Sequence, residues 1–123
     1  VLCVDEPERS VAIAQMIRQA FPQVLLVARA QDRDHVHALV EAGVEHVYRE
    51  TFFTGLEMAR EVFLGLGWAP DAAQVALESF RTLDESDLRE TQIAWRRRRA
   101  ERERESWVQE LESLFEKGTR KKG

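Results

Sequence analysis

The stretch that decides the fold is residues 24–49, which read VLLVARAQDRDHVHALVEAGVEHVYR. It begins with an apolar run at residues 24–28, and such continuous hydrophobicity is typical of a strand covered on both faces of a parallel sheet. Residues 33–42 then carry apolar side chains at helical spacing, and Gly43 is the glycine that commonly ends a helix. A second apolar run follows at residues 44–48. The stretch therefore predicts a strand, a helix and another strand.

The same alternation continues on both sides of this stretch. Residues 1–4 form a third apolar run, and a helical pattern follows from Pro7 until Pro22 ends it. Thr51 is a candidate N-cap for the next helix, and Pro70 starts a further one. This β-α-β-α-β-α order implies right-handed crossovers and a parallel sheet, so the predicted fold class is α/β.

Length and composition narrow the classes of function. The chain has 123 residues and a formal net charge of −4, which argues against a general nucleic-acid-binding protein. Three strands leave a broad sheet edge open, so we expect the N-terminal half of the sheet to precede Val1. The single cysteine, Cys3, excludes an intrachain disulfide, and its place in an apolar run predicts burial. No apolar stretch approaches the ~20 residues that span a bilayer.

The composition changes near residue 84. Residues 84–117 contain neither proline nor glycine and are dominated by charges, which predicts a long helical arm. The arginine run at residues 96–99 is followed at once by glutamates at i, i+4 spacing. A solvated helix laced with ion pairs is therefore preferred over a contact with nucleic acid or acidic lipid. An apolar stripe that starts at Trp107 needs cover from another surface, and residues 118–123 are predicted to be disordered.

Each of the three predicted strands is followed by a charged residue: Asp5, Arg29 and Arg49. Parallel strands share a carboxyl edge, and ligands bind at that edge in open α/β sheets. Arg49 also precedes a predicted helix start, where backbone amides favour anions. The alternative for Arg49 is an ion pair with Glu50 or Asp32. Asp32 is better placed as the N-cap of the helix that follows it, although it also lies near the site.

The sequence offers no catalytic or metal-binding constellation. His35 and His37 are two residues apart, so they diverge on a helix and cannot chelate one metal ion. His46 has no cysteine or histidine partner at a zinc spacing, and no nucleophile lies beside a base. The Gly-x-Gly-x-x-Gly turn that cradles dinucleotides is absent as well. We predict neither an enzyme nor a metal site, but a ligand-sensing module.

Three segments resemble the cytosolic regulatory domain of Kef-type glutathione-gated potassium efflux systems, a TrkA-N or RCK-type nucleotide-binding domain. They are residues 27–35 (VARAQDRDH), 42–46 (AGVEH) and 49–52 (RETF). The resemblance covers about residues 1–84. It implies the C-terminal half of a Rossmann-like parallel sheet, followed by the long charged helical arm.

The resemblance also implies a domain organisation and a setting. We expect a partial Rossmann-like regulatory domain at residues 1–83, the helical arm at 84–117 and the disordered tail at 118–123. The family implies a homodimer and a membrane transporter domain in the same polypeptide. This soluble piece would then lie at the cytoplasmic face of the inner membrane. No cofactor is expected in this fragment, whereas the complete domain would take NAD(H) or AMP, with Asp5 facing the nucleotide; no nucleic-acid partner is expected.

The family resemblance implies which residues form a ligand site. In the glutathione-gated members, the arginine of Arg-Glu-Thr-Phe and an asparagine on the following helical segment contact the tripeptide. The arginine corresponds to Arg49, whereas Asp84 replaces the asparagine and Gln31 replaces a second family arginine. An ionised carboxylate cannot donate to a ligand carboxylate and repels it, which counts against glutathione. The predicted ligand-binding residues are Arg49, Asp84, Arg29 and Asp32.

The leading hypothesis is a ligand-sensing regulatory module of a Kef-like potassium:proton antiporter, which controls ion efflux through rearrangement of a dimer. Two alternatives stay open. One is a fragment of a soluble NAD(P)-dependent Rossmann oxidoreductase, which needs the missing cofactor turn and a catalytic acid or base. The other is a helical scaffold that uses the Arg/Glu arm to assemble partners.

Overall fold

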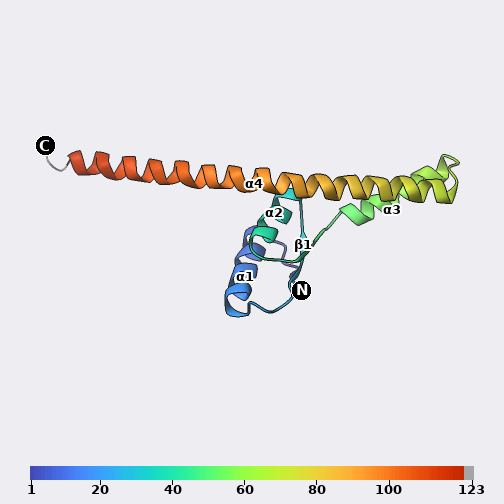
Figure 1. The fold of residues 1–123 in the computed structure, drawn as a ribbon, viewed down its shortest axis with the longest axis horizontal. Helices are drawn as coiled ribbons and strands as arrows, with labels where there is room; N and C mark the ends of the chain where they lie inside the picture. Colours follow the sequence, from blue (N-terminus) through green and yellow to red (C-terminus); the bar gives the residue numbers. More distant parts are fainter. Residues whose placement is uncertain (121–123) are drawn as a thin grey trace. The chain divides into compact units, whose positions relative to one another are not determined.

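A computed structural model of the chain describes residues 1–120. The elements, in chain order, are α1 (Pro7–Ala20), β1 (Val27–Ala30), α2 (Arg33–Glu41), β2 (His46–Arg49), α3 (Phe52–Gly65) and α4 (Pro70–Arg120) (Figure 1). The chain divides into two compact units, Val1–Arg89 and Glu90–Gly123.

The sheet of the first unit is parallel. β1 and β2 pair in a register that sets Val27 beside His46 and Ala30 beside Arg49. Leu2 forms a parallel bridge with Ala28. The Leu2 N–H donates to the Val27 carbonyl oxygen at 2.8 Å, and the Leu2 carbonyl oxygen accepts the Arg29 N–H at 2.9 Å. The predicted α/β fold with a parallel sheet is therefore confirmed.

Both strands begin later than the apolar runs predicted: β1 begins at Val27 and not at residue 24, and β2 begins at His46 and not at residue 44. Side chains form hydrogen bonds with backbone groups that precede the strands. The carboxylate of Glu45 accepts the Leu26 N–H at 2.9 Å, and Arg18 donates to the Val24 carbonyl at 3.1 Å. These groups are satisfied without a neighbouring strand, so the ladder starts after them.

Arg18 ties the end of α1 to the loops that precede both strands. Its guanidinium donates to the carbonyl oxygens of Pro22 and Gly43, each at 2.7 Å, and pairs with Glu45 at 2.6 Å. The Leu26 N–H, together with Arg18, lowers the pKa of Glu45. Gly43 has φ +92°, and a Cβ there would lie 3.1 Å from Arg18 Nε, so the turn needs glycine for both reasons.

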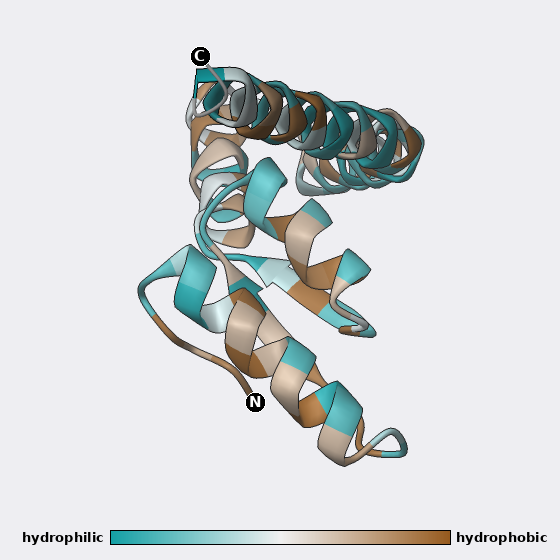
Figure 2. Ribbon diagram, turned by 90° about the vertical axis from the view of Figure 1, so that its left-hand side faces the viewer, coloured by the Kyte–Doolittle hydropathy of each residue, from teal (hydrophilic) through white to brown (hydrophobic). Residues whose placement is uncertain are grey.

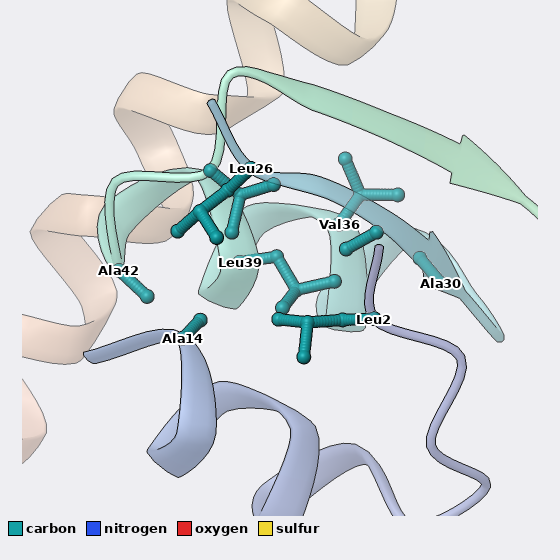
Figure 3. Close-up of a cluster of buried hydrophobic side chains, with 9 residues drawn as sticks. Leu2, Ala14, Leu26, Ala30, Val36, Leu39 and Ala42 are labelled. Carbon is teal, nitrogen blue, oxygen red and sulfur yellow. The ribbon is translucent and has the colours of Figure 1, made fainter. Parts of the chain in front are cut away.

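The core of the first unit is small and lies between the sheet and its two short helices. Figure 3 shows Leu2, Ala14, Leu26, Val36 and Leu39 directed into one cluster. The buried members are Leu2, Ala14, Leu26, Ala28, Ala30, Val36, Leu39, Ala42 and Val44. The predicted burial of Cys3 is wrong, because side chains alternate along extended chain and Leu2 takes the inward position.

The two predicted N-caps have different outcomes. Asp32 caps α2, since its carboxylate accepts the His35 N–H at 2.8 Å from an extended backbone. Thr51 precedes α3, but its hydroxyl makes no capping hydrogen bond. Its backbone is already helical, with φ −104° and ψ −8°, whereas a capping side chain normally projects from an extended residue. The expected cap by Thr51 is therefore wrong.

The last helix is longer than the sequence predicted. α4 runs without interruption through residue 84, where a separate arm was expected to begin, and includes Gly118, Thr119 and Arg120 of the expected disordered tail. The Thr119 hydroxyl donates to the Phe115 carbonyl at 3.1 Å, which satisfies an acceptor in the last turn. Residues 121–123 lie outside the described residues. The division at 1–83, 84–117 and 118–123 stays a prediction.

The substitution Leu39→Ala tests whether Leu39 belongs to the core. Its side chain is 0% exposed, so replacement by alanine leaves a cavity and should lower the free energy of unfolding of the chain by about 2–5 kcal/mol. Val40 is its control, because it is the next residue of the same helix and is exposed. Val40→Ala should cost less than about 1 kcal/mol. Denaturant titration followed by circular dichroism measures both, and equal losses would show that Leu39 is not in the core.

Candidate functional site

The carboxyl end of β2 meets α4 at an ion pair within the first unit. Arg49 is the last residue of β2, and its guanidinium Nη2 pairs with Oδ2 of Asp84. Nη1 lies 3.4 Å from the other carboxylate oxygen of Asp84, so the contact has the two-pronged form that suits guanidinium and carboxylate. The two side chains are 13% and 12% exposed. The pair is therefore held largely out of water.

A second arginine reaches the same carboxylate. Arg33, the first residue of α2, donates from Nη1 to Oδ1 of Asp84 at 3.1 Å. Its Nη2 pairs with Asp87, one helical turn further along α4, at 2.6 Å. Two guanidinium groups and two carboxylates thus form a neutral cluster that joins α2, β2 and α4.

An aromatic ring supports the guanidinium of Arg49. The Phe52 ring lies beneath it, with 4.0 Å between Arg49 Cζ and the ring centroid. Phe52 stacks in turn against Phe80 of α4, at 6.3 Å between centroids. A guanidinium over an aromatic face is attracted to it, so Arg49 is fixed by the ring as well as by the carboxylate. This arrangement presents Arg49 in one defined position.

Two hollows border the Arg49–Asp84 pair. A groove of about 420 Å³ has Arg49 in its wall and is lined along β2 and along residues 81–89 of α4. A second, more apolar hollow of about 510 Å³ lies between α3 and α4 and has Asp84 at its edge. Each has the volume of a small-molecule site. A ligand in either hollow would therefore lie next to one member of the pair.

A second charged cluster surrounds Arg29 of β1. Arg29 Nη2 pairs with Asp5 Oδ1 at 2.8 Å, and its Nε lies 4.0 Å from the Glu50 carboxylate. The Gln31 side-chain amide donates to the backbone carbonyl of Asp5. The Asp5 side chain is 95% exposed, so this ion pair contributes little to stability. Its acidic and amide groups remain accessible to a ligand.

The structure places the predicted site residues in two groups. Arg49 and Asp84 are brought into direct contact, and Arg29 joins Asp5, while Asp32 serves as the cap of α2. The alternative partners proposed for Arg49, Glu50 and Asp32, are wrong, because its carboxylate partner is Asp84. A ligand-binding role for any of them stays a prediction.

Sequence reasoning missed Arg33. It stands next to the predicted cap, and no local pattern marked it. Its partners Asp84 and Asp87 lie 51 and 54 residues away in the sequence. Only the charge of Arg33 at the start of a helix next to the sheet edge could have drawn attention to it.

His35 holds the turn between β1 and α2. It is 3% exposed, and its Nδ1 accepts the Gln31 N–H at 3.0 Å. Nε2 is buried without a hydrogen-bond partner among the described residues. Burial lowers the pKa of His35, and the nearby Asp32 carboxylate opposes this only in part. The neutral imidazole is therefore the form that the fold requires. Within residues 1–120, no three acidic, cysteine or histidine side chains are grouped to hold a metal ion.

Comparison with known proteins now identifies the first part of the chain. Residues 1–50 match the family model of the TrkA-N domain. The strands, α1, α2 and Arg49 described above all fall within this TrkA-N match.

The fold is also similar to the solved structure of the Kef C-terminal domain of Shewanella denitrificans in its AMP-bound form. The two are 30% identical in sequence, with a TM-score of 0.73, and the similarity covers 76% of this chain. The chain spans 60% of the length of that structure. The resemblance to a Kef-type regulatory domain is therefore confirmed at the level of sequence and fold. Within residues 1–120, no helix is both long enough and apolar enough to cross a membrane.

His35 makes stability depend on pH. Because its pKa is lowered in the folded protein, the unfolded chain takes up a proton first as the pH falls. The stability that the neutral form provides is complete above its ordinary pKa of 6.5 and is lost as the pH falls through that value toward the lower folded pKa. Thermal unfolding between pH 8 and pH 5 should show this decline.

His35→Asn keeps an acceptor for the Gln31 N–H and removes the titration, so its stability should decline less over the same range. The exposed His46 provides the matched control, and His46→Asn should keep the slope of the parent. Parallel curves for the parent and His35→Asn would exclude His35 as the source.

Proposed function

We propose that this chain is part of the cytosolic, ligand-sensing regulatory module of a Kef-type potassium:proton antiporter. The observation that carries the proposal is the TrkA-N match over residues 1–50 together with the similarity to a Kef C-terminal domain over 76% of the chain. In this proposal the module acts as a homodimer, and the transporter domain of the same polypeptide lies in the inner membrane. The chain itself carries no catalytic role.

The sensing element in this proposal is the Arg49–Asp84 pair. An anionic group of a small regulatory ligand would compete with Asp84 for the guanidinium of Arg49. Asp84 lies on α4, and Arg49 lies on the sheet, so exchange of one carboxylate for the other would change how α4 is held within the first unit. A ligand shifts the equilibrium between two arrangements only by the difference in its affinity for them.

The second charged cluster is proposed as part of a nucleotide site. The similar Kef structure is in an AMP-bound form. At the same type of sheet edge, an acidic side chain can accept hydrogen bonds from ribose hydroxyls. Asp5 is exposed and positioned by Arg29 at such an edge. We therefore assign AMP or NAD(H) to the complete domain, with Asp5 facing the nucleotide.

The proposed function predicts regulated potassium flux. Vesicles that contain the full-length protein and are loaded with potassium should release it in exchange for protons, and AMP should change the rate. A potassium electrode and a pH-sensitive dye inside the vesicles measure the two fluxes, with protein-free vesicles as the control. Nicotinamide reduction without any potassium flux would support the oxidoreductase alternative and contradict the proposal.

Two substitutions test the sensing element. Arg49→Ala should weaken binding of an anionic ligand by about 1.5–3 kcal/mol, the value of a hydrogen bond to a charged group. Asp84→Asn removes the competing carboxylate and supplies an amide donor, so it should improve binding of glutathione. Calorimetric titration of the full-length protein with glutathione measures both.

Asp87→Asn is the matched control for Asp84→Asn. Asp87 lies on the same helix, and its ion pair is with Arg33 and not with Arg49. It should leave glutathione affinity close to that of the parent. If Asp84→Asn has no effect, or if Arg49→Ala reverses none of the gain in the double variant, the pair is not the sensing element.

A further inference from the structure

The second unit, Glu90–Gly123, has opposite net charges on two consecutive segments of α4. Residues 96–104 contain six arginines and two glutamates, which gives a net charge of +4. Residues 105–116 contain four glutamates and neither lysine nor arginine, which gives −4. We call these the basic segment and the acidic segment. Apart from Arg99, which is half-buried, their residues are exposed.

An exposed apolar stripe runs along the acidic segment. Trp107, Leu111 and Leu114 follow one another at spacings of four and three residues, and they are 66%, 44% and 65% exposed. In Figure 2, hydrophobic and hydrophilic stretches alternate along α4. Side chains of this size and exposure are unfavourable in water, and their spacing is that of a helix that packs against another helix.

The stripe continues into the basic segment at the same spacing, but with different side chains. Its positions there are Arg97, Ala100 and Arg104, preceded by Ile93. Arginine stems are apolar and can cover leucine or tryptophan while the guanidinium stays hydrated. The basic segment can therefore cover the apolar stripe of the acidic segment, provided that the two come from different helices.

We propose that residues 95–116 form an antiparallel helix pair with the same residues of a second copy of this chain. In this arrangement the basic segment of each copy lies along the acidic segment of the other, so a segment of net charge +4 lies beside one of −4 twice. A parallel pair would set +4 beside +4 and −4 beside −4. Pairing only the two acidic segments would bury more apolar surface, but it brings −4 against −4.

The stripe fixes the register of the pair. Ala100 lies opposite Leu111 of the other copy, and Arg104 lies opposite Trp107, where a guanidinium over an indole face is favourable. The contact is isologous, so it closes as a dimer and does not extend into a filament. The ion pair within one copy, Arg99 with Glu103 at 3.2 Å, leaves the net charges of the segments unchanged.

Cysteine cross-linking tests the direction of pairing in the full-length protein. Cys3→Ser removes the thiol of this chain, cysteines elsewhere in the full-length protein are also replaced by serine, and single cysteines are then introduced as Ala100→Cys in one sample and Leu111→Cys in another. Mild oxidation of the mixed samples should cross-link position 100 to position 111 between copies, with little product in either sample alone. A product from Ala100→Cys alone indicates a parallel pair and overturns the proposal, as does the absence of any product.

A charge swap tests whether the segments recognise each other by charge. With the cross-link yield as readout, raising sodium chloride from 50 mM to 500 mM should lower the yield, because salt screens attraction between unlike charges. Glu112→Lys changes the net charge of the acidic segment from −4 to −2 and should lower the yield severalfold, and the added Arg99→Glu, which changes the basic segment from +4 to +2, should lower it further. In a parallel pair like charges lie side by side, so added salt and the smaller segment charges of the variants would both raise the yield; either result overturns the proposal.

Glu78→Lys is the matched control for the charge swap, since Glu78 is also exposed on α4 but lies in the first unit. It should leave the yield unchanged. Circular dichroism of each variant checks that helix content is retained. The proposal does not rest on the transport function, because the cross-link reports only how the second units of two copies meet.

Discussion

One carboxylate, that of Asp84, joins three elements of the first unit. It accepts from Arg33 at the start of α2 and from Arg49 at the end of β2, and it stands on α4. At 12% exposure it is as sheltered as Arg49, which is 13% exposed. Removing one partner from such a group costs more than the pair contributes, because a largely buried charge is left unmatched. The position of this part of α4 beside the sheet edge depends on that balance.

The same balance decides what the site can recognise. A guanidinium fixed by an aromatic ring and a carboxylate is already paired, so a ligand anion gains only the difference between its own contact and that of Asp84. In the proposed sensing element, the side chain on α4 therefore sets the selectivity of an arginine on the sheet. Ligand binding would then be coupled to the helix, since the carboxylate that the ligand displaces is the group that holds α4.

The order of elements and the parallel sheet were predictable from the sequence because apolar runs and helical spacing are local patterns. The strand starts were not, because Glu45 and Arg18 satisfy backbone groups that the apolar pattern had assigned to the ladder. The cap by Asp32 was found since its partner is three residues away. Arg33 was missed because its partners are more than fifty residues away, and Asp84 was singled out by family resemblance alone.

The two units differ in how their charges are balanced. In the first unit, each carboxylate of the Arg33–Asp84–Arg49–Asp87 cluster finds its guanidinium within the same unit. In the second, neighbours at i, i+4 such as Arg99 and Glu103 balance only part of the charge, and an excess of opposite sign remains on each segment. A straight helix cannot fold back to join those segments. In the proposed pair another helix balances that excess, and the antiparallel direction is the one in which both segments of a second copy meet their opposite.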